Sequence, residues 1–166
     1  RLNASVTGLG AHKHILLFDT LVKRLSVTEV EAVLAHEAGH VHHGHLAKAW
    51  AGLSLLGLAG AYAISQTVAV TGLRPAEVIG LTLAVYPSVL FWLRPLFVHV
   101  SRRFEFEADA FAARQCGSEA MGKALRAIFN ANHGVFNHHW SSAAVFAGHP
   151  IGTERLRRLR EMVQKD

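Results

Sequence analysis

The sequence predicts a mainly helical domain with a short β-hairpin at its N-terminus and two long apolar helices inserted in its middle. Three observations support this fold class. A histidine motif lies in a segment of helical periodicity, two apolar stretches follow it, and an acidic helical segment comes next. The chain has 166 residues, about the size of one domain. We therefore treat 1–166 as a single domain in three parts, 1–48, 49–100 and 101–166.

Two short strands are predicted before the first long helix. Residues 3–10 and 14–19 have the composition of strands, and turn residues that include glycine separate them. Such a hairpin can be plain scaffold, or its edge strand can hold a substrate backbone by β-augmentation. The sequence leaves both roles open.

The next segment is predicted to be a helix from its start signal and its periodicity. Ser26 and Glu29 have the spacing of a capping box, which satisfies free amide groups at a helix start. Apolar residues then recur at helical spacing, and Glu37 falls on the same stripe. We therefore expect Glu37 to be partly buried, which favours a raised pKa and suits a base that works near neutral pH.

The most informative segment of this helix is His36-Glu37-Ala38-Gly39-His40. Two histidines four residues apart project from one helix face and can share one tetrahedral metal ion. Glu37 can then reach a water on that metal, so the pattern is typical of a zinc hydrolase with Glu37 as general base. Ala38 and Gly39 leave room for a substrate or a neighbouring helix. The alternative is a chance match, because the chain holds 12 histidines.

The two apolar stretches are predicted to cross a membrane. Residues 49–73 carry no charged side chain, and at about 1.5 Å per residue they can span a hydrocarbon core of about 30 Å. Residues 78–93 are also uncharged and continue past Arg94 to Val100, with Pro87 and Pro95 expected to kink the helix. Two buried helices of a soluble domain are the alternative.

A hairpin of two spans returns the chain to its starting side of the lipid bilayer. The basic residues outside the spans lie mostly on that side, whereas the connecting turn holds only Arg74. The positive-inside rule therefore predicts an integral membrane protein whose catalytic parts face the cytoplasm. Cys116 is the single cysteine, which excludes an internal disulfide and agrees with that compartment. We expect it to be a buried structural thiol.

The positive charge does not indicate a nucleic-acid-binding protein. The formal net charge is +5, and a cluster of arginines lies near the C-terminus. These arginines are expected on the polar face of a final helix whose Leu156, Leu159 and Val163 pack inward. No nucleic-acid recognition module accompanies the charge. We therefore expect no nucleic-acid partner.

A third metal ligand is expected after the apolar stretches. Glu105 and Asp109 lie four residues apart, on one face of a continuing helix. One of the two can bind metal while the other orients a ligating histidine. Glu107 lies elsewhere on the helix and is expected to be solvated or paired with Arg103. A plain charged helix surface is the alternative for this cluster.

A candidate for stabilising negative charge lies near the C-terminus. Pro150 favours an extended turn that can hold His149 outside regular structure, and Arg155 begins the last helix. A histidine or arginine placed there can stabilise the oxyanion that forms when water adds to a peptide carbonyl. Most loop histidines have no such role.

Together these segments resemble the type I CAAX prenyl endopeptidases, which are membrane zinc metalloproteases of the gluzincin group. The resemblance covers nearly the whole chain. Beyond the histidine motif it includes Asn3-Ala4, Gly8-Leu9-Gly10, Ile15 to Leu21, Glu31 to Ala35, Gly44-His45, Tyr86-Pro87, Ser101 to Ala112, His149-Pro150 and Glu154-Arg155-Leu156. The ordered combination is far more specific than the metal motif alone.

The resemblance implies a zincin-like catalytic domain and a role for each matched residue. It implies that His36, His40 and Glu105 bind one zinc ion and that Glu37 is the catalytic base. The remaining roles go to Asp109 as a carboxylate behind the ligands, His149 and Arg155 as contacts to substrate or intermediate, and Asn3 at the substrate-binding edge strand. The nearby histidines have no ligand role in that pattern: His42, His43 and His45.

The expected activity is hydrolysis of peptide bonds in membrane-associated or prenylated protein substrates. A heat-shock type membrane quality-control protease shares the same zinc core and is one alternative. An inactive zinc-binding sensor or scaffold is another. The chain begins at Arg1 and lacks the upstream membrane helices of the full prenyl proteases, so we expect it to be part of a longer, multi-pass protein. The segment 130–146, rich in His and Asn, matches the family only loosely.

Overall fold

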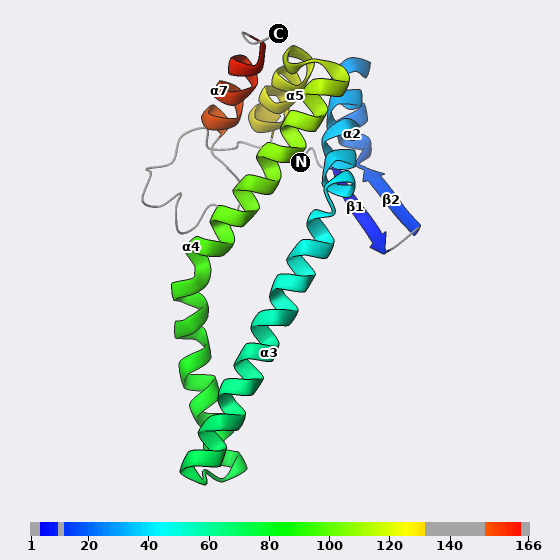
Figure 1. Ribbon diagram of the computed structural model, residues 1–166. Helices are drawn as coiled ribbons and strands as arrows, with labels where there is room; N and C mark the ends of the chain where they lie inside the picture. The colour runs from blue at the N-terminus through cyan, green and yellow to red at the C-terminus, as the bar shows by residue number, and fades with distance from the viewer. Residues whose placement is uncertain (1–3, 10–11, 132–151, 164–166) are drawn as a thin grey trace.

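The computed structural model describes residues 4–9, 12–131 and 152–163, and the fold is mainly helical. Figure 1 shows a helical domain from which two long helices extend as a V. The described elements are β1 (Ala4–Leu9), β2 (His12–Leu17), α1 (Asp19–Val22), α2 (Val27–His42), α3 (His45–Thr71), α4 (Pro75–Cys116), α5 (Ser118–Ala131) and α7 (Gly152–Val163).

The two strands form an antiparallel sheet in which Ala4 pairs with Leu17 and Leu9 pairs with His12. The second strand begins and ends two residues earlier than the sequence predicts. Its end moves because Asp19 opens the short helix α1, where a carboxylate in the first turn interacts favourably with the free backbone N–H groups. Asn3 lies outside the described residues.

Helix α2 begins with the predicted capping box. The Glu29 backbone N–H donates to the Ser26 hydroxyl, and the Ser26 backbone N–H donates to the Glu29 carboxylate at 2.8 Å. These bonds satisfy amide groups that have no partner within the helix. The helix therefore starts where the sequence predicts, which sets the rotation of every later side chain, including those of the histidine motif.

Helices α3 and α4 contain the two apolar stretches, and both are long and apolar enough to cross a membrane. Figure 1 shows them meeting at the far end of the molecule and diverging towards the helical domain. Their large apolar side chains face outward, as at Leu58 (69% exposed) and Leu83 (71% exposed). A buried pair of helices in a soluble core would have covered these side chains. Pro87 and Pro95 lie inside α4, which continues through both as one helix.

The core of the domain forms where the end of α4 packs against α2, α5 and α7. Leu21, Ala112, Ala124 and Leu159 are almost fully buried in it. Cys116 is free and only half-buried, at the edge of this core. Small residues on α4 allow the helices to approach closely, so the last third of α4 packs tightly against α2.

Helix α7 is amphipathic, with Leu159 buried and the arginines at 157, 158 and 160 exposed, as the sequence predicts. Arg155 differs from the rest of that arginine cluster. It turns inward and is 8% exposed, because buried carboxylates on α4 lie opposite it. A charged side chain this deep requires charged partners, and Glu105 and Asp109 supply them.

Candidate metal centre

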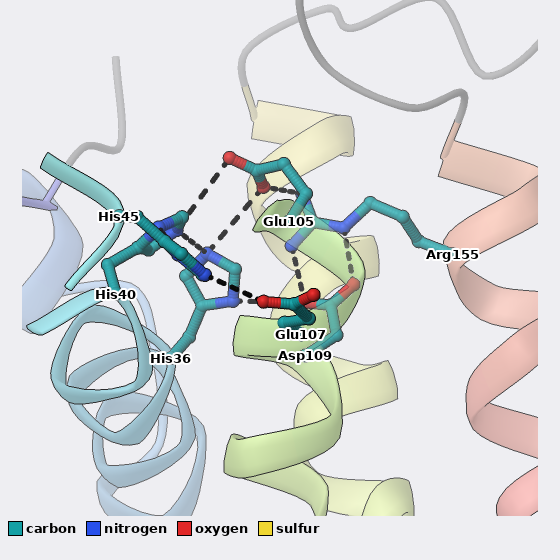
Figure 2. A network of polar contacts seen from close by, with 7 residues as sticks. All are labelled: His36, His40, His45, Glu105, Glu107, Asp109 and Arg155. Atoms are coloured by element: carbon teal, nitrogen blue, oxygen red, sulfur yellow. Dashed lines mark hydrogen bonds and ion pairs between the residues drawn. The ribbon is translucent and has the colours of Figure 1, made fainter. Parts of the chain in front are cut away.

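Three potential metal ligands meet where α2 crosses α4. His36 and His40 come from α2 and Glu105 comes from α4, and their donor atoms lie within 4.8 Å of one another. The two Nε2 atoms are 3.2 Å apart. Glu105 Oε2 lies 3.6 Å from His36 Nε2, and its Oε1 lies 3.7 Å from His40 Nε2. Figure 2 shows both imidazole rings facing this carboxylate between the two helices.

These separations fit a tetrahedral metal ion. With bonds of 2.0 to 2.1 Å, two donors on a tetrahedral zinc ion lie about 3.3 Å apart. The two Nε2 atoms lie close to that separation. Glu105 approaches His36 through one oxygen and His40 through the other, so its carboxylate faces both rings at 3.6 and 3.7 Å. Two imidazoles and one carboxylate are also the donor types that zinc prefers. The residues present therefore fit a metal ion in both chemistry and spacing.

Gly39 makes the close crossing of α2 and α4 possible. A Cβ atom at this position would lie 3.0 Å from Ala108 Cα and 3.1 Å from Phe111 Cβ. No side chain fits there unless the helices separate. Of the two roles that the sequence leaves for this glycine, the structure therefore supports the packing of a neighbouring helix. That packing brings the histidines of α2 within reach of Glu105.

The surroundings of His40 favour the neutral ring. Burial and the neighbouring His36 lower the pKa of His40 to about 4, against the opposing effect of Glu105. A metal ligand must offer an unprotonated nitrogen, so the ring is in the form that binds metal at neutral pH. This electrostatic state agrees with the distances above.

Asp109 lies behind His36, one helical turn after Glu105. Its Oδ1 is 3.0 Å from His36 Nδ1, a hydrogen-bond distance, although the ring N–H is not aligned as in a full hydrogen bond. A carboxylate at Nδ1 favours the proton on that nitrogen and leaves Nε2 with a lone pair facing Glu105. The position matches the sequence expectation that one of the two carboxylates orients a histidine.

Arg155 joins α7 to this cluster. Its Nε and Nη2 donate to the two oxygens of Asp109 at 2.7 and 2.6 Å, and its Nη1 lies 3.2 Å from Glu105 Oε2. Burial opposes the charge, but Asp109 and Glu105 outweigh it, so the pKa of Arg155 is raised above its ordinary value. The guanidinium thus holds the carboxylates of Glu105 and Asp109 in place (Figure 2).

Glu37 lies on α2 between the two histidines and is half-buried, as its place on the apolar stripe predicts. Its charge acts on Arg155, which places it near the same cluster. The expected general base therefore lies on the same helix as two of the potential ligands, within electrostatic reach of Arg155.

The contacts of His45 were not predicted from the sequence. Its ring is 4% exposed, its Nδ1 lies 2.9 Å from His40 Nδ1, and its Nε2 lies 3.1 Å from Glu107 Oε2. Glu107 is paired with Arg103, as predicted, but also with this histidine. Glu107 and His45 lie 62 residues apart, so no local pattern reveals the contact. The glycine before His45 was the available signal, since it allows a sharp turn.

Two other predicted site residues cannot be placed. Asn3 and His149 lie outside the described residues, as does most of the segment 130–146. Their roles stay predictions.

The helical fold and the His-His-Glu cluster are typical of helical metalloproteases. The chain belongs to peptidase family M48, whose model matches residues 1–163. This finding supports the resemblance stated above.

Individual relatives agree with this assignment. The uncharacterized metalloprotease YhfN of Bacillus subtilis is 35% identical over 66% of this chain and 28% of its own length. A CAAX prenyl protease 1 homolog of Arabidopsis thaliana is 29% identical over 93% of the chain and 39% of its own length. The protease HtpX of Shewanella halifaxensis is 33% identical over 75% of the chain and 48% of its own length. The chain thus spans less than half the length of these relatives.

The fold is also similar to that of a solved structure. The crystal structure of S. mikatae Ste24p superposes with a TM-score of 0.77 and 24% sequence identity, covering 95% of this chain and 42% of Ste24p. At this identity the likeness extends to the fold. It agrees with the mainly helical architecture described above.

Proposed function

We propose that this chain is the catalytic part of a zinc endopeptidase that cleaves membrane-associated proteins. One observation carries the proposal: His36, His40 and Glu105 offer three donor atoms within 4.8 Å of one another, next to a half-buried Glu37. Three protein ligands leave a fourth position for water or substrate, as in catalytic rather than structural zinc sites. Membership of peptidase family M48 supports a metal-dependent protease.

The chain's own residues account for the proton transfers. A zinc ion held by the three ligands would polarise the scissile carbonyl and increase the acidity of the attacking water. Glu37 accepts the proton of that water as general base while the oxygen attacks the carbonyl carbon. Glu37 then donates the same proton to the leaving amine as the C–N bond breaks. Asp109 keeps His36 oriented throughout, and Arg155 keeps Asp109 ionised and in place.

The peptide is proposed to bind along β1. The sheet has two strands in the described part of the chain, so β1 pairs with β2 on one edge only. A substrate in extended form can add to the other edge by β-augmentation. Asn3, which precedes β1 in the sequence, stays the predicted substrate contact. His149 and Arg155 remain the candidates for stabilising the oxyanion. Arg155 also contacts Glu105 and Asp109, so it would have to stabilise the oxyanion while keeping these contacts.

The membrane location is proposed from the exposed apolar surfaces of α3 and α4. The bilayer would cover these side chains, and the helical domain would face the cytoplasm, following the distribution of basic residues. A cysteine introduced at Leu73, in a Cys116→Ser background, tests the orientation. An impermeant maleimide applied to intact cells should label this cysteine. Labelling only after the cells are opened would show that the helical domain faces the opposite side of the membrane.

The central test compares the chain with its Glu37→Gln variant. The variant should bind zinc as the parent does and lose proteolysis almost completely, because the general base contributes about 10²- to 10⁴-fold. Unchanged cleavage would overturn the assignment of Glu37. Zinc binding without any proteolysis in the parent chain would favour the sensor or scaffold alternative.

The substrate class is tested separately. A farnesylated C-terminal peptide, its unprenylated form and an unfolded casein-like protein are compared as substrates. We propose membrane-associated or prenylated substrates, since the chain resembles a CAAX prenyl protease 1 homolog over 93% of its length. The likeness to protease HtpX keeps quality control of membrane proteins as the second candidate. Preferential cleavage of the unfolded protein would favour the quality-control function.

A further inference from the structure

A second series of polar contacts leads away from the potential metal ligands on the side of His40. It runs from His40 on α2 to His45 at the start of α3 and ends at Glu107 on α4. Figure 2 shows the His45 ring between the other two side chains. None of the roles assigned above involves His45 or Glu107. The chain of contacts therefore needs its own explanation.

The protons in this chain can be assigned from its end. The Glu107 carboxylate only accepts hydrogen bonds, so His45 Nε2, 3.1 Å away, donates its proton. The other nitrogen of the neutral ring, Nδ1, is then an acceptor and receives the proton of His40 Nδ1 at 2.9 Å. This leaves the lone pair of His40 on Nε2, the atom that faces His36 and Glu105.

The surroundings of His45 fix the plane of its ring. The ring stacks on Phe104 at 4.2 Å between centroids and an interplanar angle of 11°, with His43 stacked at 5.5 Å and 14°. The turn before it is equally specific, because Gly44 has φ of 64°, a conformation that favours glycine. Both nitrogens of this buried ring have hydrogen-bond partners, as a buried polar group requires, and these partners fix the direction of the ring.

We infer that His45 and Glu107 form a positioning relay that holds His40 in the tautomer and orientation needed to bind the metal ion. The inference rests on the proposed metal site and deepens it. The relay is the counterpart of Asp109 at His36, so each ligating histidine has its own partner at Nδ1. His45 is a positioning residue, since it acts on the metal only through His40.

The experiment measures zinc affinity of the full chain in detergent by competition with a chromophoric chelator. His45→Phe keeps the stack on Phe104 but removes both ring nitrogens. We expect zinc to bind about 10- to 100-fold more weakly, the usual effect of losing such a partner. The absorption spectrum of the Co²⁺-loaded protein should change with it, because His40 can now turn. An unchanged affinity and spectrum would overturn the inference.

Variants at Glu107 keep the test decisive if His45→Phe does not fold. Glu107→Gln retains an oxygen that accepts from His45 Nε2 and should bind zinc within a few-fold of the parent. Glu107→Leu removes the acceptor and should weaken zinc binding about tenfold or more. Equal affinities for the two variants would contradict the relay. Arg103→Gln is the matched control, since it removes the other partner of the same carboxylate. It should leave zinc affinity unchanged.

Two further measurements separate the possible causes. A purely structural role for His45 would lower the unfolding midpoint of the metal-free protein and leave zinc affinity intact, which would contradict the relay. Cleavage by the parent chain is measured independently. Zinc affinity that depends on His45 in a chain without proteolysis would support the relay and reject the endopeptidase. Proteolysis by the parent chain, together with zinc affinity that does not change in His45→Phe, would support the endopeptidase and reject the relay.

Discussion

Arg155 of α7 donates two hydrogen bonds of 2.6 and 2.7 Å to Asp109 of α4, and both side chains are almost completely buried. Asp109 in turn lies 3.0 Å from His36 Nδ1. The pair therefore ties the last helix of the chain to the potential metal ligands on α2. This arrangement makes the stability of the domain and the geometry of the site depend on the same contact.

Breaking the pair should destabilise the domain. Arg155→Met leaves the charge of Asp109 buried without its main partner, and we expect a loss of about 3 to 5 kcal/mol in the free energy of unfolding. Denaturant unfolding of the metal-free protein in detergent measures it. Arg160→Met, an exposed position on the same helix, is the matched control and should change stability by about 0.5 kcal/mol or less. Equal effects at the two positions would contradict the structure.

The close crossing at Gly39 should tolerate no side chain. Gly39→Ala places a Cβ 3.0 Å from Ala108 Cα, and the resulting overpacking should cost about 1 to 3 kcal/mol. Separation of α2 from α4 should also weaken zinc binding, because two ligands lie on one helix and the third on the other. Gly57→Ala is the control, since nothing lies within 4 Å of its added Cβ. A stable Gly39→Ala protein with normal zinc affinity would refute this account of the crossing.

Removal of the metal should lower stability. A ligand that binds only the folded state at 100 times its dissociation constant adds about 2.7 kcal/mol, so a chelator should reduce the thermal midpoint of the loaded protein. His40→Gln should bind too little zinc for such a shift. His42→Gln, an exposed position on the same helix, should keep it. A chelator effect that survives in His40→Gln would place the metal elsewhere.

Charges on the outer faces of α3 and α4 should impair membrane integration. Leu58 and Leu83 are highly exposed, and arginine near the middle of a span costs about 2.5 to 3.5 kcal/mol on insertion scales. The Leu58→Arg, Leu83→Arg double variant should therefore be extracted from membranes at alkaline pH, whereas the parent stays bound. Val22→Arg, exposed on α1, is the control and should behave as the parent does. Parent protein released by the same treatment would argue against a bilayer around the hairpin.

Local patterns in the sequence determined much of this architecture. The capping box of Ser26 and Glu29 set the start of α2, and the four-residue spacing put His36 and His40 on one face of it. The apolar segments predicted two long helices, because length and hydropathy are properties of a continuous stretch of chain. All of these signals act within one or two helical turns or within one segment, so they can be recognised without knowing the fold.

Only the tertiary structure decided which distant side chains meet. The spacing of Glu105 and Asp109 placed both on one face of α4 but left open which of them faces the histidine pair. The depth at which α2 and α4 cross, set by Gly39 against Ala108, brings Glu105 to the two Nε2 atoms and Asp109 to Nδ1 of His36. The packing of α7 against α4 turns Arg155 inward, and the packing of α3 against α4 brings Glu107 to His45. Such contacts depend on how whole helices pack against one another, and the spacing of residues along the sequence does not predict that packing.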